Sequence, residues 1–410
     1  MNKGIKHDIL KRMNLCTILD SISEKQPVSR KDLAAHTCLT PGAVSRLVSE
    51  LINCGLVVES GHDKSEKRLG GPNPILLCIS GGPPYVIAVN LGVAVAMVGL
   101  VNFHADIIEQ ESFHFNDSWD SKKIISSIIE CVELIIKRSR LSLQKDVLAL
   151  GVGVAGTVDT KEGILLWHKL KTLRYYPLKE TLENLLGVPT YVDNFLQSMA
   201  LAEARFGKGK NLESFAYVYV GNVVCSAMVL EGKVLNGKRN LIGQIGHNVV
   251  NPEGAQCICG NRGCLEAIIS DQSIVNQAKQ LYNSNFDTKL RILAGTPDKI
   301  NKDLVIKAAE DGDELCGKLL KQRGSYVGEA IANIVNLFDP QMVIIARSVG
   351  NYESTIEFEA ISQAYKKNVC FENTCPPIVR SENKTGELFY IGAASLAIRM
   401  VLSPEYTFPF

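Results

Sequence analysis

A histidine and three cysteines lie close together between residues 243 and 266, in a segment that reads G-Q-I-G-H-N-V-V-N-P-E-G-A-Q-C-I-C-G-N-R-G-C-L-E. The four residues are His247, Cys257, Cys259 and Cys264, and the Gly, Asn and Pro around them disfavour a packed apolar core. Three thiolates and one imidazole are a complete tetrahedral ligand set for Zn²⁺. The sequence therefore predicts a Zn²⁺ site, and because protein side chains fill all four positions we expect a structural metal. The alternative is three buried thiols beside an unrelated histidine.

Length and composition indicate a globular protein with more than one domain. The chain has 410 residues, of which 46% are hydrophobic and 21% are charged, and this length allows about two to three domains. No apolar run reaches about 18 residues, and the first residues lack the apolar segment of a signal peptide. We therefore expect a cytoplasmic protein without membrane insertion. Cys370 and Cys375 have no neighbouring ligand to complete a second metal site, so we interpret them as ordinary thiols.

The N-terminal part of the chain carries the pattern of a helix-turn-helix. Apolar residues recur at helical spacing over residues 9–23. Ser29 is the expected N-cap of a short second helix, and Thr40 followed by Pro41 marks the start of a third helix that ends near Asn53. Two short helices joined by a tight turn, the second small and polar on its outer face, are typical of a DNA-binding helix-turn-helix.

A hairpin is predicted directly after these helices. Residues 56–59 and 75–79 have the composition of strands, and residues 62–71 between them are polar. Helices followed by such a wing predict a winged helix-turn-helix over residues 1–80, and the alternative is a small helical interaction domain with a charged loop. The residues that we expect to contact DNA are Thr40, Ser45, Arg46 and Ser49 on the third helix and Lys64, Lys67 and Arg68 on the wing.

The charge distribution agrees with a DNA-binding N-terminal domain. Residues 1–80 hold 11 Lys and Arg against 8 Asp and Glu, a net charge of +3, and the remaining residues hold 33 against 35, a net charge of −2. This excess of positive charge is modest, so it supports DNA binding without establishing it.

Beyond residue 81 the pattern is that of an α/β protein. Two strand-like runs over residues 85–102 precede an amphipathic helix over residues 121–139. A buried strand with a glycine-rich exit follows over residues 147–159, and another strand ends near residue 195. The glycine-rich exit contains G-x-G-x-x-G, but the rest of a dinucleotide-binding unit does not follow it, so we expect a turn that lines a ligand cleft.

These segments resemble the ROK family (repressors, open reading frames and sugar kinases). The family has G-E-I-G-H followed by C-x-C-G-x-x-G-C-x-E, and this chain matches it except at Gln244, where the family has Glu. Residues 151–159 resemble the family's G-I-G-x-P-G-x-V-D, and residues 392–397 resemble its G-A-A-x-x-A. The resemblance implies a winged helix-turn-helix followed by a two-lobed actin-like ATPase fold with a structural zinc loop. The implied domains are residues 1–80, lobe 1 over residues 81–195 completed by residues 388–410, and lobe 2 over residues 196–387, with the zinc loop and a dimerisation surface.

The residues that the family's sugar kinases use for phosphoryl transfer are replaced in this chain. Asn90 stands where they have the Asp that holds the metal and phosphates, and Phe195 stands where they have the Asp that accepts the sugar proton. Val223 and Cys225 replace two glycines of the second phosphate loop, and Ala346-Arg347 replaces the Gly-Gly that contacts adenosine. We therefore expect no enzyme activity, with Asp193 as a shifted catalytic base being the less favoured alternative.

The resemblance also implies a ligand and a partner. It is strongest with the xylose-, N-acetylglucosamine- and glucose-responsive repressors, so we expect a dimeric or tetrameric repressor of sugar-utilisation genes that binds operator DNA and a sugar or sugar phosphate. The alternatives are a sugar kinase with an extra N-terminal domain, and a repressor controlled by a protein partner from a sugar-transport system. The positions implied for the ligand are Lys169, Asn194, Gln244, His247 and Glu266.

Overall fold

The N-terminal helices begin at side chains that cap their free backbone N–H groups. Ser29 Oγ accepts a hydrogen bond from the Asp32 N–H at 3.2 Å, and Thr40 Oγ1 accepts one from the Ala43 N–H at 3.3 Å. The computed structural model describes residues 3–62, 73–237, 240–284, 287–347, 354–370, 375–381, 385–403 and 406. The N-terminal elements are α1 (Lys3–Lys25), β1 (Val28–Ser29), α2 (Arg30–Thr37), α3 (Pro41–Asn53), β2 (Val57–His62) and β3 (Ile75–Ile79).

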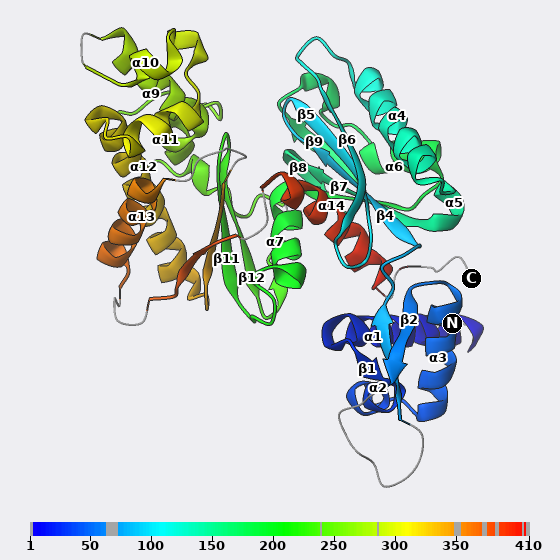
Figure 1. Ribbon diagram of the computed structural model, residues 1–410. Helices are drawn as coiled ribbons and strands as arrows, with labels where there is room; N and C mark the ends of the chain where they lie inside the picture. The colour runs from blue at the N-terminus through cyan, green and yellow to red at the C-terminus, as the bar shows by residue number, and fades with distance from the viewer. Residues whose placement is uncertain are drawn as a thin grey trace. The chain divides into compact units, whose positions relative to one another are not determined.

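These elements form a winged helix, as the sequence predicts. The three helices pack together around buried apolar residues of α1 and α3, and the strands form an antiparallel sheet in the order β1-β3-β2 (Figure 1). The pairing of β2 with β3 extends to His62 opposite Ile75. Lys64, Lys67 and Arg68 follow His62 in the chain and lie outside the described residues.

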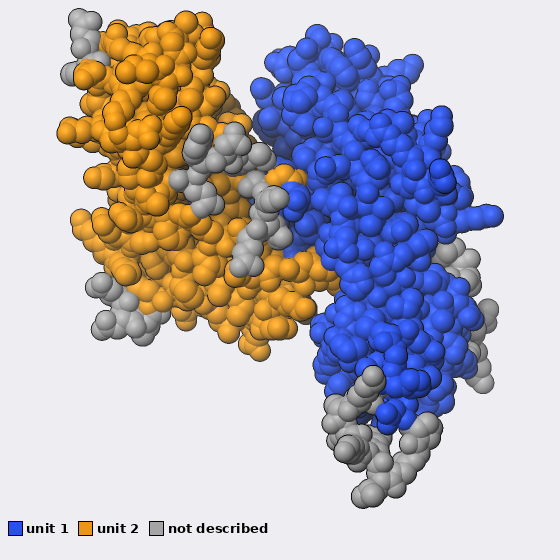
Figure 2. Space-filling view, in the orientation of Figure 1, with its two compact units in different colours: residues 1–202, 387–410 blue, residues 203–386 orange. Residues whose placement is uncertain are grey.

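The chain divides into two compact units, residues 1–202 with 387–410 and residues 203–386 (Figure 2). We call them unit 1 and unit 2. Besides the winged helix, unit 1 contains β4 (Tyr85–Leu91), β5 (Val95–Val101), β6 (Ile107–His114), α4 (Ser121–Ser139), α5 (Leu143–Asp146), β7 (Val147–Val154), β8 (Gly156–Asp159), β9 (Ile164–His168), η1 (Lys171–Leu173), α6 (Leu178–Leu186), β10 (Thr190–Asn194) and α14 (Thr385–Val401). The division falls inside α7 (Phe195–Phe206).

The main sheet of unit 1 has five strands in the order β10-β7-β4-β5-β6. Strands β4, β7 and β10 are parallel to one another, whereas β5 and β6 are antiparallel to their neighbours. Strand β7 is buried along its whole length because helices cover both faces of the sheet.

Apolar stripes on α4 and α6 pack against one face of this sheet and form an apolar core with it. Helix α14 lies on the opposite face, where Gly99 and Gly151 allow Tyr390 and the Ala393 backbone to approach the strands (Figure 1). The last helix of the chain therefore completes the fold of the first unit.

Unit 2 is built on a second five-stranded sheet in the order β13-β12-β11-β14-β15. Helices α8 and α12 share an apolar core with this sheet, and α13 packs along α12. The N-terminal half of α12 joins α9, α10 and α11 in a separate helical core. The elements of this unit are β11 (Phe215–Val220), β12 (Val224–Leu230), β13 (Lys233–Val234), η2 (Ile245–His247), α8 (Leu265–Ile269), α9 (Asp271–Asn283), α10 (Leu290–Ala294), η3 (Pro297–Lys299), α11 (Lys302–Glu310), α12 (Glu314–Phe338), β14 (Val343–Arg347), α13 (Thr355–Asn368) and β15 (Ile378–Arg380).

Candidate functional site

Helix α3 presents a small, polar outer face to solvent. Its buried residues are Val44, Leu47, Val48 and Leu51, which form one helical stripe toward the core of the winged helix. Ser45, Arg46 and Ser49 lie on the exposed side, and Thr40, which caps the helix, is also exposed. Arg46 forms no ion pair with any residue that the structure describes, so its guanidinium is available to an external acceptor.

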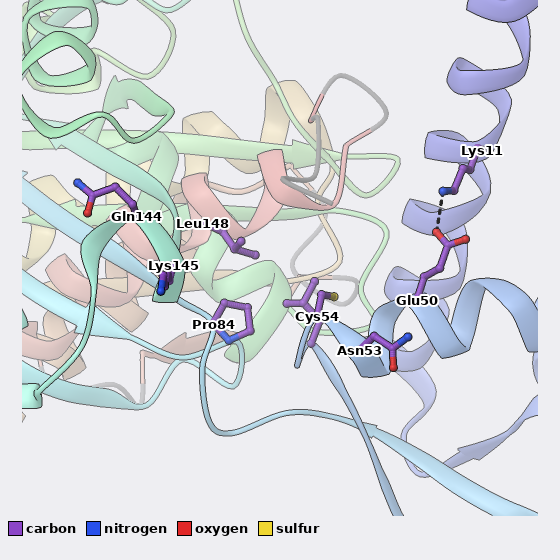
Figure 3. Close-up of a pocket in the computed structure, with 9 residues that line it drawn as sticks. Lys11, Glu50, Asn53, Cys54, Pro84, Gln144, Lys145 and Leu148 are labelled. Atoms are coloured by element: carbon purple, nitrogen blue, oxygen red, sulfur yellow. Dashed lines mark ion pairs between the residues drawn. The ribbon is translucent and has the colours of Figure 1, made fainter.

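The opposite side of α3 is tied to α1 and borders a cavity. Lys11 Nζ lies 2.8 Å from Glu50 Oε2, which joins α1 to the second half of α3. Both residues line a cavity of about 650 Å³ in unit 1 (Figure 3). The remaining lining residues come from the end of α3, the linker and the α5 region, and they are Asn53, Cys54, Leu56, Pro84, Gln144, Lys145 and Leu148.

The linker between the winged helix and β4 is held by hydrogen bonds to the turn after β5. Asn102 Nδ2 donates to the Gly81 carbonyl at 3.2 Å, and a ring nitrogen of His104 lies 3.0 Å from the Ile79 carbonyl oxygen. The Ser80 N–H donates to the Leu56 carbonyl at 2.9 Å. These contacts connect the winged helix to the main sheet of unit 1.

The four predicted metal ligands come together in unit 2. The donor atoms of His247, Cys257, Cys259 and Cys264 all lie within 4.8 Å of one another. Two of the separations, Cys257 Sγ to His247 Nδ1 and Cys259 Sγ to Cys264 Sγ, are 3.6 Å. A tetrahedral ion with bonds of about 2.3 Å to sulfur separates two sulfur ligands by about 3.8 Å. The donor set therefore fits a bound metal ion.

The backbone of the cysteine segment folds back on itself to make this arrangement. The Val250 N–H and the Asn251 N–H both donate to the Gly263 carbonyl, at 2.9 and 3.1 Å. Gly263 has a φ of +69°, and a Cβ at this position would lie 1.4 Å from the Asn251 carbonyl oxygen. Only glycine therefore fits where the two halves of the segment cross.

Three predicted ligand residues, Gln244, His247 and Glu266, belong to the segment of unit 2 that carries the metal ligands, and His247 is in both predicted sets. Glu266 is 7% exposed at the start of α8, and its Oε2 accepts a hydrogen bond from the Val224 N–H at 2.8 Å. Burial raises the pKa of its carboxyl above the ordinary 4.5, against smaller lowering contributions from the Val224 N–H and His247. Gln244 is exposed and lines a groove of about 550 Å³ between residues 241–250 and α12.

The other two predicted ligand residues belong to unit 1, and one of them already has internal partners. Asn194 Nδ2 donates to the Gly156 carbonyl at 2.7 Å, and its Oδ1 accepts from the Leu196 N–H at 2.8 Å. Lys169 is exposed. A single cleft formed by the ligand residues of both units remains a prediction.

His168, next to Lys169, is a buried structural residue that sequence reasoning did not single out. Its Nδ1 accepts from the Leu170 N–H at 3.1 Å, and its Nε2 lies 3.1 Å from the Gly92 carbonyl oxygen, to which the neutral ring donates. Burial lowers the pKa of this histidine below the ordinary 6.5, which favours the neutral form. His168 therefore connects the turn between β4 and β5 to the end of β9 through a hydrogen bond.

Two kinase positions have packing or backbone roles in this chain. Phe195, the first residue of α7, is 7% exposed, and its ring lies 6.2 Å from the ring of Phe389. In the turn between β11 and β12, the Gly221 N–H donates to the Val223 carbonyl at 3.0 Å, and the Val224 N–H is bonded to Glu266. Two backbone N–H groups of this turn are thus already paired, and burial, reinforced by Glu266, raises the pKa of the adjacent Cys225 thiol.

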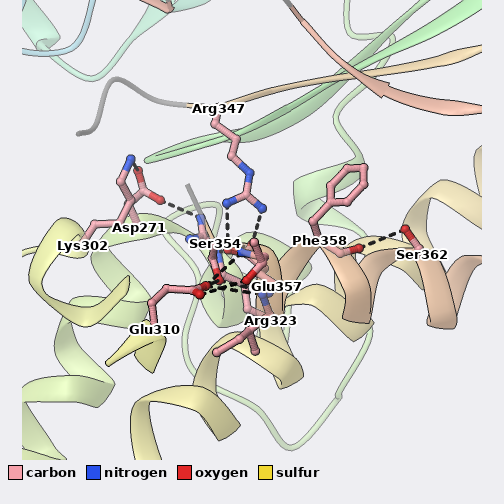
Figure 4. A network of polar contacts seen from close by, with 11 residues as sticks. Asp271, Lys302, Glu310, Arg323, Arg347, Ser354, Glu357, Phe358 and Ser362 are labelled. Carbon is pink, nitrogen blue, oxygen red and sulfur yellow. Dashed lines mark hydrogen bonds and ion pairs between the residues drawn. The ribbon is translucent and has the colours of Figure 1, made fainter. Parts of the chain in front are cut away.

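At the end of β14, Arg347 reaches onto Glu357 of α13 (Figure 4). Its Nη1 and Nη2 lie 2.8 and 2.7 Å from the two carboxylate oxygens of Glu357, which is 0% exposed. Arg323 of α12 lies between Glu357 and Asp271, at 3.6 and 2.6 Å. Burial raises the pKa of Glu357, but Arg347 and Arg323 together hold it below its ordinary value.

The sequence contains one signal for this ion network. Arg323 interrupts the apolar stripe of α12 between Leu320 and Val327, so a helical reading of the segment would place a charge in the core. No local pattern identifies Glu357 or Asp271 as its partners, because they lie 34 and 52 residues away.

None of the described helices combines the length and the apolar composition needed to cross a membrane.

Relatives in sequence match between 83% and 97% of the chain. A xylose repressor from Caldicellulosiruptor bescii is 29% identical over 339 residues, which cover 83% of this chain and 84% of the relative. The DNA-binding transcriptional dual regulator NagC from Escherichia coli is 26% identical over 404 residues, which cover 97% of this chain and 95% of the relative.

Solved structures share the fold. A ROK family transcriptional regulator, described as a homolog of the E. coli MLC protein, matches 96% of this chain and 97% of its own with a TM-score of 0.82 at 24% identity. A ROK family glucokinase from Streptomyces griseus, in complex with glucose and AMPPNP, matches 77% of this chain and 99% of its own with a TM-score of 0.68 at 25% identity. These similarities confirm the predicted α/β fold class. The sequence profile of the ROK family matches residues 86–400, well over half of the chain, and the protein therefore belongs to the ROK family.

Proposed function

We propose that this chain is a transcriptional repressor of sugar-utilisation genes that binds operator DNA, is controlled by a sugar or sugar phosphate, and does not transfer phosphate. The observation that carries the proposal is the polar outer face of α3 on a winged helix, in a chain whose relatives over almost its full length are named as regulators. A chain with this architecture has a DNA-reading surface that a sugar kinase does not need.

In this proposal α3 lies in the major groove. Thr40, Ser45, Arg46 and Ser49 contact the DNA from this helix, and Arg46 supplies the base-reading contact because a guanidinium binds guanine through two hydrogen bonds. Lys64, Lys67 and Arg68 meet phosphates or the minor groove. Two copies of the chain, as a homodimer or in a dimer of dimers, set the spacing of the two half-sites of a palindromic operator.

The metal in this proposal is a structural Zn²⁺ held by His247, Cys257, Cys259 and Cys264. Thiolate and imidazole donors in a closed set of four favour zinc over magnesium or calcium. The metal fixes the segment that leads into Glu266 at the start of α8, and so couples the metal site to the ligand site. His247 directs Nδ1 toward Cys257, which leaves its Nε2 for the sugar.

The effector binds Lys169, Asn194, Gln244, His247 and Glu266. Lys169 adds a positive charge and Gln244 removes a negative one compared with the family's pattern, which favours a phosphorylated or acidic sugar. The effector shifts the protein between DNA-competent and DNA-incompetent states only by its different affinity for the two states.

Loss of phosphoryl transfer is supported by the residues at the kinase positions. Phe195 cannot accept a proton from a sugar hydroxyl, and Asn90 cannot replace the carboxylate that holds a metal. The internal bonds of the turn at Gly221–Val224 leave fewer free N–H groups for a phosphate. A kinase with an extra N-terminal domain is the second candidate because a glucokinase shares the fold of the body.

The test combines operator selection with effector screening. Operator sequences are selected from random DNA with the purified chain, and sugars and sugar 6-phosphates are then added to the complex. We expect one of these ligands to release the DNA. Glu266→Ala should bind the operator but should not release it when the ligand is added. Glu266→Gln keeps an oxygen that can accept from the Val224 N–H. Comparing the two variants therefore distinguishes the effect of losing the carboxylate charge from the effect of losing that hydrogen bond.

Selection of no preferred sequence would contradict the repressor function, and unchanged release from Glu266→Ala would contradict the ligand site. Consumption of ATP that depends on a sugar would favour the kinase. Release of the operator only on addition of a protein from a sugar-transport system, and by none of the sugars, would favour control by a protein partner.

A further inference from the structure

Asn90 lies at the position in the sheet of unit 1 where ligands usually bind. It is the penultimate residue of β4 and pairs with Gly153 of β7, which pairs in turn with Asp193 of β10. Within this sheet, β4 is followed along the chain by β5 on one side, and β7 is followed, after β8, β9 and α6, by β10 on the other side. In open α/β sheets, ligands bind at the carboxyl ends of strands at such a reversal of strand order.

The amide nitrogen of Asn90 is buried without a partner in the described part of the chain. The residue is 5% exposed, and its Nδ2 has no hydrogen-bond acceptor among the residues that the structure describes. A buried donor without an acceptor destabilises the folded protein, so such a group calls for an explanation, and one explanation is a bound ligand. Asn90 therefore differs from an ordinary buried asparagine.

Asn102 is an ordinary buried asparagine in the same unit. It is 2% exposed, and its Nδ2 donates to the Gly81 carbonyl and to Asp106 Oδ2 at 3.2 and 3.0 Å. Its Oδ1 accepts from the N–H groups of His104 and Asp106, at 2.9 Å each. Every polar atom of this amide is satisfied within the protein, so Asn102 is a matched control for Asn90.

The neighbouring amide at the same edge of the sheet already has internal partners, which leave one N–H and one oxygen lone pair for the effector. Asn194, at the end of β10, uses Nδ2 and Oδ1 in the bonds to Gly156 and Leu196. Its side chain therefore shapes the start of α7. The amide nitrogen at this edge that has no partner among the described residues is that of Asn90.

Gly153 lies close to the Asn90 amide, and a side chain at this position would crowd it. A Cβ on Gly153 would lie 3.5 Å from Asn90 Nδ2 and 3.1 Å from Ser198 Oγ, which itself donates to the Phe195 carbonyl at 2.6 Å. A glycine at this position keeps the space between the amide and the hydroxyl free of side-chain atoms. A ligand oxygen within reach of Asn90 Nδ2 finds a donor, and a ligand hydroxyl within reach of Ser198 Oγ also finds an acceptor.

We propose that Asn90 Nδ2 donates a hydrogen bond to an oxygen of the sugar effector, and that Asn90 is thus a ligand-binding residue of the protein. This inference rests on the proposed function. The oxygen belongs to a hydroxyl or to a phosphate group of the ligand, because both accept from an amide. A neutral amide at this place, in contrast to a carboxylate, does not repel a phosphate.

Two substitutions of similar size test the proposal. Asn90→Leu removes the donor, and Asn90→Asp replaces it with an acceptor and adds a negative charge. Binding is measured by titration calorimetry with xylose, glucose, N-acetylglucosamine, and the 6-phosphates of the last two sugars. For each sugar that the wild type binds, we expect Asn90→Leu to bind about tenfold more weakly.

Asn90→Asp identifies the oxygen. If it is a hydroxyl, the carboxylate accepts a hydrogen bond from it, and Asn90→Asp binds more tightly than Asn90→Leu. If it is a phosphate oxygen, the two negative charges repel, and Asn90→Asp binds more weakly than Asn90→Leu. Either result supports the proposal, provided that Asn90→Leu has lost affinity.

Urea unfolding without ligand distinguishes a ligand-binding role of Asn90 from a structural role, because the two roles predict opposite shifts of the urea midpoint of Asn90→Leu. Asn90→Leu should unfold at the same or a higher urea concentration than the wild type, because it removes an unpaired buried donor. Asn102→Leu should unfold at a lower concentration, because it leaves the partners of Asn102 unpaired. A midpoint of Asn90→Leu as low as that of Asn102→Leu would show that the amide is paired inside the protein, for instance with a buried water, and would overturn the proposal.

The sugar titration distinguishes this inference from the function on which it rests. Wild-type affinity of Asn90→Leu for a sugar that the wild type binds would contradict the role of Asn90 alone. If the wild type binds none of the five sugars, sugar control fails, and the role of Asn90 fails with it.

Discussion

The ring of Phe195 lies 6.2 Å from the ring of Phe389, with an angle of 44° between the ring planes. Phe195 opens α7 and Phe389 lies in α14, so the contact joins the end of β10 to the last helix of the chain. The geometry is that of an attractive tilted aromatic pair in a buried environment. A position that sugar kinases use for a proton acceptor is thus part of the packing in this protein.

We expect no sugar phosphorylation by the wild-type protein, and we expect that Phe195→Asp does not create it. The carboxylate would be buried beside Phe389, so the substitution should lower the free energy of unfolding by about 3–5 kcal/mol. A coupled assay of ATP consumption with a panel of sugars and urea unfolding measure the two effects.

Leu185→Asp is the control, because Leu185 is 57% exposed on α6. It should change stability by no more than about 0.5 kcal/mol. Sugar-dependent ATP turnover above background in the wild type would show that the kinase function survives.

The four-ligand metal site predicts one bound zinc ion per protein chain. Elemental analysis of the purified protein should find one Zn²⁺ per chain, and Cys259→Ser should lose it because three ligands hold zinc much more weakly than four. The variant should also unfold at a lower temperature. Cys370→Ser, which changes another exposed cysteine, should keep the metal. Carefully purified wild-type protein without zinc would rule out the zinc site.

DNA binding should depend on Arg46 in a sequence-specific manner. Arg46→Ala should weaken operator binding by about 1–3 kcal/mol and relax the preference at one base pair, as expected for the loss of a bidentate contact to guanine. Fluorescence anisotropy with the selected operator and with single-base variants measures both effects.

Two kinds of substitution serve as comparisons for Arg46→Ala. Alanine at Lys64 or Lys67 should weaken binding to all sequences alike and lower the slope of log K against log salt by about one. Alanine at Lys137, an exposed residue of α4, should have little effect. Wild-type affinity of Arg46→Ala for the operator would place the DNA-reading face elsewhere.

Stability should depend on pH through Asp193. Burial raises the pKa of its carboxyl from 3.8 to about 6, against lowering contributions from the Asn194 N–H and Arg399. The folded state then holds the proton more tightly than the unfolded state, so Asp193 makes stability fall as the pH rises from about 4 to 6. Asp193→Asn should therefore stabilise the protein above pH 6 by up to about 3 kcal/mol and have little effect at pH 4.

Urea unfolding of wild type and variant from pH 4 to pH 8 measures this difference. Taking the difference removes the contribution of His168, whose lowered pKa makes stability rise with pH. Asp117→Asn, at an exposed position, should leave the pH profile unchanged. An Asp193→Asn effect that is the same at pH 4 and pH 8 would contradict the raised pKa.

The pairing of Arg347 with Glu357 should be required for the stability of unit 2. Arg347→Met leaves the buried carboxylate of Glu357 with only the more distant Arg323, and we expect a loss of about 3–5 kcal/mol. Replacing both residues, as in Arg347→Met with Glu357→Leu, should restore much of this loss because no unpaired charge remains. A double variant that is less stable than Arg347→Met would show that the carboxylate has other essential partners.

Much of the local structure follows from short-range signals in the sequence. The caps Ser29 and Thr40 are where they were predicted, and the predicted helix over residues 121–139 coincides with α4. The four predicted metal ligands come together. All four lie within eighteen residues, and the glycines among them let the backbone fold back so that three thiols and an imidazole can meet. Caps, helical stripes and ligand spacings are each encoded within about twenty consecutive residues, and each can be read without its tertiary context.

The tertiary structure alone decides which polar groups are paired. Arg323 meets Asp271 across 52 residues of chain, and His168 meets Gly92 across 76. Asn90 on β4 and Asn102 directly after β5 are the same residue type, yet the amide of Asn102 has internal partners and the Nδ2 of Asn90 has none among the residues that the structure describes. The resemblance to the family implies that a carboxylate is replaced at residue 90, but burial and hydrogen bonding depend on atoms that come together only when distant segments pack, and no local pattern contains them.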